Sequence, residues 1–385
     1  MKKIKVGLMT YAIDGRLGKG TAIVARYAVE ELLKNQNDFD LTFLHYEKSD
    51  EKFYNHGVME VIFPRFTFKY LNFRWFRQIY YFLTTKDHYD VILWFQPRMY
   101  PLFWLAPAKN LICWIHGAGD LGEENVKTRD LGRSMFNWSL KNYNSKLCLA
   151  FAGSEFARQD VINKYGFEDP KKVKVVHYGV DSFYYRRSEE EIKNIRQKFN
   201  LPENFLLNVA RLNPGKNAFR VIRAFDKFAT ENPSETIHFV NIGDIGSEAE
   251  EIKKYISESK NKDRIHLVGG FLDRMTDLPA IYSAAYALVF PLLNEGFGLP
   301  IMEAMNCGTP TVVSNTCYPD ITEKETILVD ALSDDSVAEG IRKIVKDKAL
   351  RQELIGNGYI FVRNFTWQKM GENIMNIFRD IDGIK

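Results

Sequence analysis

Two glutamates eight residues apart surround a glycine loop in the stretch NEGFGLPIMEAMNCGTP, which runs from 294 to 310. The preceding letters, AYALVFPLL, are apolar, β-branched and aromatic, which is typical of a buried strand. Pro300 suits the first turn of a helix, because the N–H group at that position is unpaired anyway. Gly308 favours an end to that helix. The pattern predicts a strand, a glycine loop and a helix, with Glu295 before the helix and Glu303 inside it.

This arrangement could bind a phosphorylated ligand. The start of the helix would offer free N–H groups and a positive dipole end to a phosphate, and Gly296 and Gly298 would let the backbone approach it closely. Glu295 could reach a polar group beyond the phosphate, and Glu303 could accept two hydroxyls, such as those of a ribose. A tight turn with a solvated Glu303 is the simpler interpretation of a lone glycine turn. The full pattern Glu-Gly-Phe-Gly-Leu-Pro, followed by Glu-Ala, is much more specific.

Two cations follow another predicted strand, in the stretch NVARLNPGKN. Arg211 and Lys216 lie around a turn marked by Pro214 and Gly215. Two cations in one loop at the carboxyl end of a strand can neutralise a diphosphate and stabilise it as a leaving group. A solvated basic turn would be commoner for such a loop in isolation. Its place at the end of a strand, together with the glutamate motif, favours the functional interpretation.

A glycine-rich loop near the start, AIDGRLGKGTAIVARY, has the spacing Gly-x-x-Gly-x-Gly. Dinucleotide-binding folds use Gly-x-Gly-x-x-Gly and place an acid at the end of the second strand. The sequence has neither feature, so a hydride-transfer enzyme is poorly supported. Gly18 and Gly20 still lead into a predicted helix and could approach a diphosphate or an acceptor.

His116 ends the predicted strand NLICWIH and precedes the letters GAGD. A lone histidine is usually structural or lies on the surface. A histidine at the carboxyl end of a parallel strand, followed by glycine, more often faces a ligand. We therefore expect His116 in the site, with Asp120 as a weaker candidate.

Strand-like and helical patterns alternate along the whole chain, which predicts parallel sheets covered on both faces. The strand-like segments are 3–10, 40–46, 58–63, 89–95, 110–116, 146–153 and 172–179, then 204–211, 236–244, 264–271, 287–293, 309–315 and 326–330. Two such series predict two doubly wound, Rossmann-like α/β domains facing each other across a cleft. Ligands of such folds bind beyond the carboxyl ends of the strands, so the loop from Glu295 to Gly298 should face that cleft.

We expect the domain boundary in the charged, strand-free stretch 186–204. This gives an N-terminal domain over 1–185, a C-terminal domain over 186–364 and a last helix over 365–385. No further strand precedes that helix, so it could pack elsewhere than on the C-terminal domain.

Length and composition narrow the function classes. A chain of 385 residues, with 45% hydrophobic and 26% charged residues, suits two globular domains. A net charge of +3 gives no case for bulk electrostatic binding of nucleic acid. The four cysteines show no CxxC spacing, so we expect free thiols in a reducing compartment.

The sequence shows no targeting or spanning segment. Its start, MKKIKVGLMTY, predicts a first strand rather than a signal peptide. No apolar run approaches the roughly 18–20 residues of a membrane span. We expect a cytoplasmic protein, either free or peripheral at the inner face of the membrane.

Together these residues resemble the retaining nucleotide-sugar glycosyltransferases of the group 1 family (glycosyltransferase family four), which have the GT-B fold. The family's paired-glutamate motif is similar to Glu295 and Glu303, and its basic motif to Arg211, Lys216 and Asn217. Further segments similar to family patterns are 153–156, 172–181, 282–315 and 365–378. The resemblance spans most of the C-terminal domain and is patchier in the N-terminal one.

The resemblance implies a nucleotide-sugar donor on the C-terminal domain, an acceptor on the N-terminal domain and a last helix that crosses back to the latter. The reaction would be front-side transfer with retention, in which the leaving phosphate helps to deprotonate the acceptor, without a metal or another cofactor. Arg211 and Lys216 would hold the diphosphate, while Glu295 would meet the sugar hydroxyls. Glu303 would meet the ribose, and His116 would lie near the sugar.

Two groups of residues follow from this resemblance. The catalytic candidates are His116, Glu295, Arg211 and Lys216. The donor-binding candidates are Gly18, Gly20, Asn217, Gly296, Phe297, Gly298, Leu299 and Glu303. Two stretches depart from the family pattern: LGKG stands at 17–20, where adjacent glycines are commoner, and CYPDI stands at 317–321, where many relatives carry Leu-Pro-Glu.

The stretch from 63 to 82 holds ten aromatic and four basic residues and no acid. A helix through it would carry a stripe of three aromatics with two arginines beside it: Phe73, Phe76, Tyr80, Arg74 and Arg77. Such a helix either lies in an anionic membrane interface or buries its aromatics in the core with its arginines solvated. The sequence favours neither.

Other functions compatible with the same fold stay open. A nucleotide-sugar 2-epimerase would need further acid/base residues beside His116, and a sugar phosphorylase would need a lysine for pyridoxal phosphate. A non-catalytic sugar-nucleotide-binding partner subunit is the alternative outside enzymes, although the intact basic and glutamate motifs argue against it. The sequence does not name the sugar, base, acceptor or linkage. A hexose from a UDP or GDP sugar and a cell-surface glycan or lipid-linked acceptor are what the family suggests.

Overall fold

The structure is a computed structural model of the chain. It describes residues 3–10, 13, 20–47, 57–67, 73–96, 99–116, 131–270, 272–293, 296–316 and 320–383. Gly18, Asp120 and Glu295 lie outside the described residues. The chain forms two compact units: unit 1 consists of Met1–Gly179 with Trp367–Lys385, and unit 2 of Val180–Thr366.

Unit 1 is built on a parallel sheet. Its described strands number seven, in the order β3-β2-β1-β4-β5-β6-β7. The strands are β1 (Ile4–Met9), β2 (Phe39–His45), β3 (Met59–Ile62), β4 (Tyr89–Trp94), β5 (Ala108–Trp114), β6 (Leu149–Ala152) and β7 (Val173–Val175). The helices are α1 (Gly20–Leu33), α2 (Arg74–Thr84), α3 (Leu131–Tyr143), α4 (Glu155–Tyr165) and α12 (Trp367–Gly383).

Unit 2 has the same type of architecture. Its described strands number six, all parallel, in the order β10-β9-β8-β11-β12-β13. The strands are β8 (Phe205–Val209), β9 (His238–Ile242), β10 (Ile265–Val268), β11 (Ala287–Phe290), β12 (Thr311–Ser314) and β13 (Ile327–Val329). The helices are α5 (Glu189–Phe199), α6 (Ala218–Glu231), α7 (Ala249–Glu258), α8 (Asp277–Ala284), α9 (Leu299–Asn306), α10 (Asp334–Lys346) and α11 (Lys348–Val362).

Every strand-like segment of the sequence overlaps one of these strands. The central strands are apolar runs because both faces of each sheet are covered: β4, β11 and β12 bury all of their residues. The predicted fold class is therefore confirmed, with two doubly wound parallel sheets of the α/β class. The stretch 186–204, expected to hold the boundary, contains α5, which opens with a capping box at Ser188. The chain passes from unit 1 to unit 2 a few residues earlier, after Gly179.

The strand order reverses once in each sheet. In unit 1, β1 pairs with both β2 and β4, and in unit 2, β8 pairs with both β9 and β11. The crevice at such a reversal, beyond the carboxyl ends of the strands, is the preferred ligand position of open α/β sheets. In unit 2 this crevice is the place where the loops that follow β8 and β11 meet.

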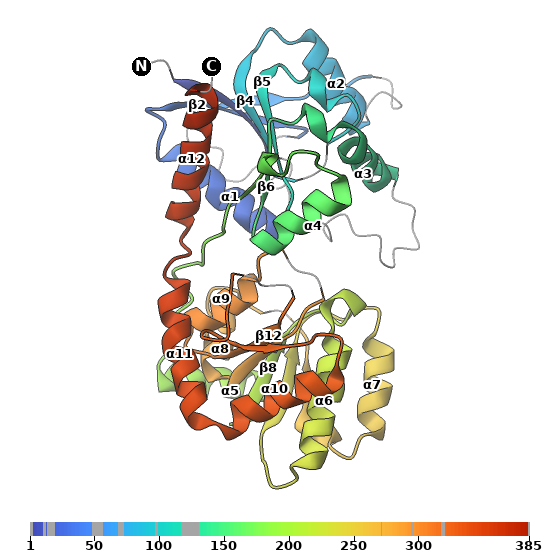
Figure 1. Ribbon diagram of the computed structural model, residues 1–385, viewed down its shortest axis with the longest axis vertical. Helices are drawn as coiled ribbons and strands as arrows, with labels where there is room; N and C mark the ends of the chain where they lie inside the picture. The colour runs from blue at the N-terminus through green and yellow to red at the C-terminus, as the bar shows by residue number, and fades with distance from the viewer. Residues whose placement is uncertain are drawn as a thin grey trace. The chain divides into compact units, whose positions relative to one another are not determined.

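Helix α12, at the C-terminal end of the sequence, packs on α1 of unit 1 (Figure 1). Trp367 stacks on Tyr27 with ring centroids 4.3 Å apart. The helices approach so closely at Gly371 that a Cβ atom there would lie 2.3 Å from the Cβ atom of Glu31. The chain thus returns to unit 1 after completing unit 2.

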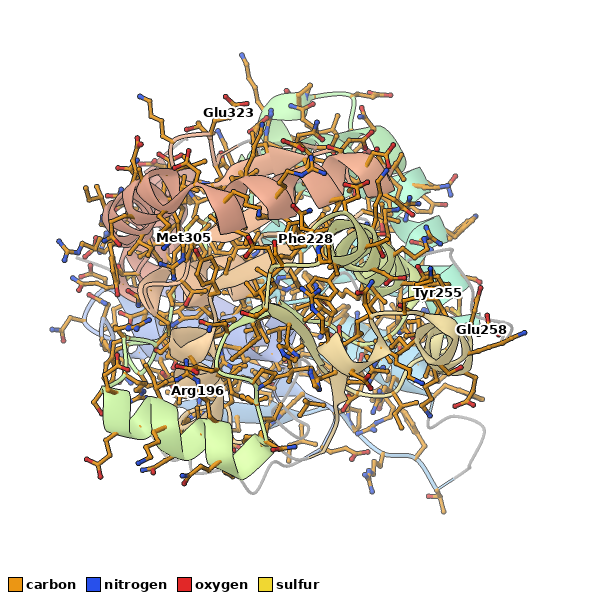
Figure 2. The ribbon with its side chains drawn as sticks, turned by 90° about the horizontal axis from the view of Figure 1, so that it is seen from below. Arg196, Phe228, Tyr255, Glu258, Met305 and Glu323 are labelled. Carbon is orange, nitrogen blue, oxygen red and sulfur yellow. The ribbon has the colours of Figure 1, made fainter. Side chains whose placement is uncertain are left out.

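The core of unit 2 lies between its sheet and the helices on either face. Figure 2 shows Phe228 and Met305 in the interior and Glu258 at the periphery, in agreement with their burial. The three described cysteines are free: Cys113 and Cys307 are buried, and Cys148 is half-buried. Burial raises the pKa of the Cys307 thiol to about 12, so it stays protonated at neutral pH.

Candidate functional site

The basic loop of unit 2 follows β8, as predicted. Arg211 lies just beyond the end of the strand, and Lys216 ends a short 3₁₀ turn over Pro214–Lys216. The Arg211 side chain is 56% exposed and forms an ion pair with the exposed Asp244, at 2.9 Å. Because a surface pair of this kind contributes little stability, Arg211 could exchange Asp244 for a diphosphate at low energetic cost.

Asn217 fixes this loop to the neighbouring strands. It adopts a left-handed backbone conformation, with φ of 55°, at the start of α6. Its side-chain amide donates to the carbonyls of Pro291 and Ala331, both at 2.8 Å, and these residues follow β11 and β13. The Asn217 amide therefore positions the loop, and the assignment of Asn217 to the donor-binding residues stays a prediction.

The glycine loop follows β11 and leads into α9. Gly298 has φ of 85° at the N-terminal cap of the helix, a conformation that favours glycine, and Pro300 occupies the first turn. Among the described residues, the backbone amides of Gly298 and Leu299 make no hydrogen bond. These amides and the positive end of the helix dipole suit an anion. Phe297 is buried and its ring packs edge-on against Phe365, which anchors the loop.

Glu303, one turn inside α9, is buried and bonded through both carboxylate oxygens. Arg274 donates to Oε1 at 3.1 Å and the Tyr282 hydroxyl donates to Oε2 at 3.0 Å. Burial raises the pKa of Glu303, while the charge of Arg274 and the hydrogen bond of Tyr282 oppose that rise. The interpretation of Glu303 as a solvated helix residue is therefore wrong, because the residue is only 5% exposed.

The loop after β9 supports the basic loop. A Cβ atom on Gly243 would lie 2.3 Å from the Ala210 carbonyl oxygen, and one on Gly246 would lie 2.0 Å from the Leu212 carbonyl oxygen. Both glycines are required by this close approach of two backbones. The same loop carries Asp244, the partner of Arg211.

In unit 1, His116 lies just beyond β5, as predicted, with both ring nitrogens hydrogen-bonded. Nε2 donates to the Phe95 carbonyl at 2.7 Å, because a carbonyl can only accept, and Nδ1 accepts from the Tyr178 hydroxyl at 2.7 Å. The ring also stacks on Trp114. Burial lowers the pKa of His116 to about 4, so the imidazole is neutral at physiological pH.

We predict that His116 does not titrate above pH 5. Its folded-state pKa lies below the unfolded value of 6.5, so the contribution of His116 to the free energy of unfolding is fully present above pH 6.5. This contribution is lost as the pH falls toward 4, and the total loss is about 3 kcal/mol. NMR titration of the ring should report a neutral Nε2–H tautomer between pH 5 and 8. A midpoint near 6.5 would show that the ring is solvated instead.

Gly20 is the first residue of α1 and lies in unit 1 at the reversal between β1 and β4. Beside it, the Gln96 side chain, just past β4, donates to the Thr21 hydroxyl at 3.2 Å. Polar groups therefore line the carboxyl edge of this sheet too. In the part of the chain that the structure describes, no group of three or more His, Cys, Asp or Glu side chains could hold a metal ion.

Two family models match the chain. Glycosyl transferases group 1 matches residues 190–361, and Glycosyltransferase Family 4 matches residues 18–182. The chain belongs to the group 1 glycosyltransferases.

Two proteins similar to this glycosyltransferase are mannosyltransferases by name. O-antigen chain mannosyltransferase B of Escherichia coli is 26% identical, over 59% of this chain and 59% of the relative. The serotype-specific mannosyltransferase WbdA of E. coli is 30% identical, over 56% of this chain and 27% of the relative. The match thus spans less than two thirds of the length of either relative.

Solved structures share the fold. A glycosyltransferase from Rickettsia africae superimposes with a TM-score of 0.74 at 15% identity, over 100% of both chains. Anabaena HepE, solved in complex with UDP and glucose, superimposes with a TM-score of 0.71 at 17% identity, over 98% of this chain and 100% of that one. The two units of the glycosyltransferase are therefore those of the GT-B fold.

The described candidates of unit 2 lie in the loops that follow β8 and β11 and in α9, at the β8–β11 reversal. The Asn217 amide joins the basic loop directly to the chain that leaves β11, so Arg211 and Lys216 share this edge with the glycine loop. His116 and Gly20 belong to unit 1.

Sequence reasoning missed Arg274, Asp244 and the glycines beside it. The letters IGDIG directly after a strand were a usable signal for the β9 loop, since glycines at a strand end often allow close backbone approach. Arg274 had no such signal, because its partners lie far away in the sequence.

The aromatic-basic helix α2 matches neither of the two interpretations fully. Phe73, Phe76 and Tyr80 are exposed, with Phe73 at 67%, so these aromatics are not core. Arg77 is only 4% exposed, and its guanidinium donates to the carbonyls of Pro64, Tyr46 and Phe63. The expectation that Arg77 is solvated or faces a membrane is therefore wrong, because its donors are used inside the protein. Within the described residues, every helix is too short or too polar to span a bilayer.

Proposed function

We propose that this glycosyltransferase transfers a hexose, with retention, from a UDP- or GDP-linked sugar to a glycan or lipid-linked acceptor in cell-surface polysaccharide synthesis. The observation that carries the proposal is that two cations in the loop after β8 and the start of α9, whose Gly298 and Leu299 amides make no hydrogen bond among the described residues, belong to the same β8–β11 reversal of unit 2. The names of the relatives support it: two are mannosyltransferases, and HepE was solved with UDP and glucose.

The proposed chemistry assigns the leaving group to unit 2. Arg211, Lys216 and the amides at the start of α9 stabilise the charge that develops on the diphosphate as the bond between sugar C1 and phosphate oxygen breaks. The acceptor oxygen forms the new bond to C1 on the same face, and its proton passes to the leaving phosphate oxygen. These cations and the helix dipole take the place of a metal ion. Neutral His116, with both ring nitrogens hydrogen-bonded, is a positioned group of unit 1 rather than a general acid.

A thermal-shift screen across UDP, GDP and ADP sugars tests the proposal. A ligand at about 100 times its dissociation constant adds about 2.7 kcal/mol to the unfolding free energy, so the true donor should stand out from the others. Steady release of nucleoside diphosphate without acceptor supports an enzyme, whereas tight binding without turnover indicates a binding subunit. The absence of a shift with every nucleotide sugar, at millimolar concentration, would refute the proposal.

The same proposal places the acceptor at an anionic membrane surface, contacted by α2. Its exposed Phe73, Phe76 and Tyr80 form one stripe, with the exposed Arg74 beside it. A helix with an apolar stripe flanked by cations binds at the boundary between headgroups and acyl chains. Replacing both Arg74 and Arg77 with glutamate would be a poor test of membrane binding, because Arg77 is buried.

We predict that Phe73→Ser with Phe76→Ser lowers retention on anionic liposomes by at least about tenfold, since each buried phenylalanine contributes about 1.5–3 kcal/mol. Cosedimentation with vesicles measures this. Ile360→Ser, at a comparably exposed apolar residue of unit 2, is the control and should change nothing. Equal retention of all three proteins would count against a membrane role for α2.

A further inference from the structure

Arg274 links two buried carboxylates in unit 2. It lies in the loop between β10 and α8, and its guanidinium contacts Asp181 Oδ2 at 2.8 Å through Nη1 and Glu303 Oε1 at 3.1 Å through Nη2. The side chains of Asp181 and Glu303 are 1% and 7% exposed. A guanidinium can hold two such groups at once because its donors point in fixed, different directions.

The surroundings of Arg274 restrict its position. Its guanidinium lies 5.5 Å from the ring centroid of Phe183 and 5.6 Å from that of Tyr184, within cation–π range. The backbone of the loop is fixed as well, because the Asp273 carboxylate accepts the amides of Met275 and Thr276. Arg274 is therefore held toward Glu303 by contacts on several sides.

The charge of Arg274 favours the ionised form of Glu303. Burial favours the protonated acid instead, and protonation turns one carboxyl oxygen into a hydrogen-bond donor, which leaves fewer acceptor sites for two hydroxyls. The ionised group has about four lone-pair sites, so each oxygen can accept one ribose hydroxyl besides its present partner. The charged or titratable groups that face Glu303 are Arg274, Tyr282, Tyr184 and, one turn further along α9, Cys307. Among them only Arg274 is positive, and Asp181 lies behind it.

We propose that Arg274 is a positioning residue of the donor site: it holds Glu303 as an oriented carboxylate for the ribose hydroxyls of the nucleotide, and Asp181 holds Arg274. This inference rests on the proposed function. It makes selection for a ribonucleotide a property of an ion-pair chain, Asp181–Arg274–Glu303, rather than of Glu303 alone.

The test measures binding of GDP, UDP and their 2′-deoxy forms to the full chain by calorimetry, between pH 6 and 8.5. The wild type should prefer the ribose form of its nucleotide by about tenfold or more, as expected for loss of a hydrogen bond to a charged group. Arg274→Met should bind that nucleotide about ten- to a hundredfold more weakly at pH 7 and lose most of the ribose preference. Its affinity should recover at higher pH, because Glu303 then ionises without help.

Arg274→Lys keeps the charge but reaches only one carboxylate. It should keep the pH dependence of the wild type with about three- to tenfold less ribose preference. If Arg274→Met does not fold, Arg274→Lys serves as the test of the inference. An unchanged ribose preference in Arg274→Lys would then overturn the inference.

Lys198→Met is the matched control. Lys198 contacts both oxygens of the buried Asp277 at 2.7 Å, and Asp277 supports the Arg274 loop by accepting the Asp273 amide. Removing the Lys198 cation loosens the loop that carries Arg274 but leaves the Arg274 charge next to Glu303. The ribose preference and its pH dependence should therefore stay as in the wild type.

The outcomes separate the two claims. If the wild type binds a nucleotide and Arg274→Met shows the same affinity, ribose preference and pH profile, the inference is wrong while the proposed function stands. If Lys198→Met reproduces the behaviour of Arg274→Met, the effect is structural and the inference is wrong. If the wild type binds no nucleoside diphosphate, both claims fall.

Discussion

Replacing Lys216 with alanine should abolish the thermal shift given by the donor and lower the rate of transfer by about 10²–10³. The reason is electrostatic. A diphosphate leaving group gains negative charge in the transition state, and a preorganised cation stabilises that charge more strongly than it stabilises the bound substrate. Steady-state kinetics with the donor identified by the thermal-shift screen measures the rate, and differential scanning fluorimetry measures the shift.

The apo protein should tolerate this substitution. Lys216 is half-buried at the end of a 3₁₀ turn, and alanine keeps the backbone hydrogen bond to Asn213 that closes the turn. Lys253→Ala, on the exposed surface of α7, is the control and should leave both readouts unchanged. An unaltered shift and rate in Lys216→Ala would mean that the donor diphosphate binds elsewhere. Glu303→Ala would be a less clean test than Lys216→Ala, because it also removes a member of a buried ion-pair network.

Replacing Gly246 with alanine should destabilise unit 2 by about 3 kcal/mol, as in other overpacked sites. The new Cβ atom would lie 2.0 Å from the Leu212 carbonyl oxygen and 2.3 Å from Asn213 Oδ1, so the backbone itself must move. For a unit of this size the melting temperature should fall by about 6–12 °C. Donor binding should weaken as well, because the displaced segment carries Arg211.

Gly356→Ala is the matched control for this prediction. Gly356 lies on the exposed side of α11, and a Cβ atom there would meet nothing within 4 Å. Alanine in a helix interior is favoured over glycine by about 0.5–1 kcal/mol, so this variant should melt at the same temperature or slightly higher. A Gly246→Ala protein that melts with the wild type would show that the loops after β8 and β9 adapt freely.

The fold could be predicted from the sequence because its signals are local. Apolar runs such as YDVILW and ALVF are long enough to cross a sheet and carry no polar face, which identifies them as strands buried on both sides. The glycine loop before Pro300 predicted the start of α9 for the same kind of reason, since turn and cap preferences act within a few residues.

Burial of polar groups could not be predicted in this way. Nothing in the residues around Arg77 indicates that it is buried, because its three carbonyl partners come from two separate segments of the chain. Asn217 resembles a ligand-binding residue of a family motif, yet both hydrogens of its amide are taken by carbonyls 74 and 114 residues away. In each case the partner decides the role, and the partner is distant in sequence.

By itself, then, the amino-acid order determined the two parallel-sheet units, the loops that end β8, β11 and β5, and the residue types offered there to a phosphorylated ligand. Only the tertiary structure decided that the β8 and β11 loops are neighbours, that His116 is held neutral by Phe95 and Tyr178, and that Glu303 shares Arg274 with Asp181. The physical reason is range. Strand, turn and cap preferences depend on neighbours along the chain, whereas charge state and hydrogen-bond pairing in a low-dielectric interior depend on whichever groups the fold brings within about 3 Å.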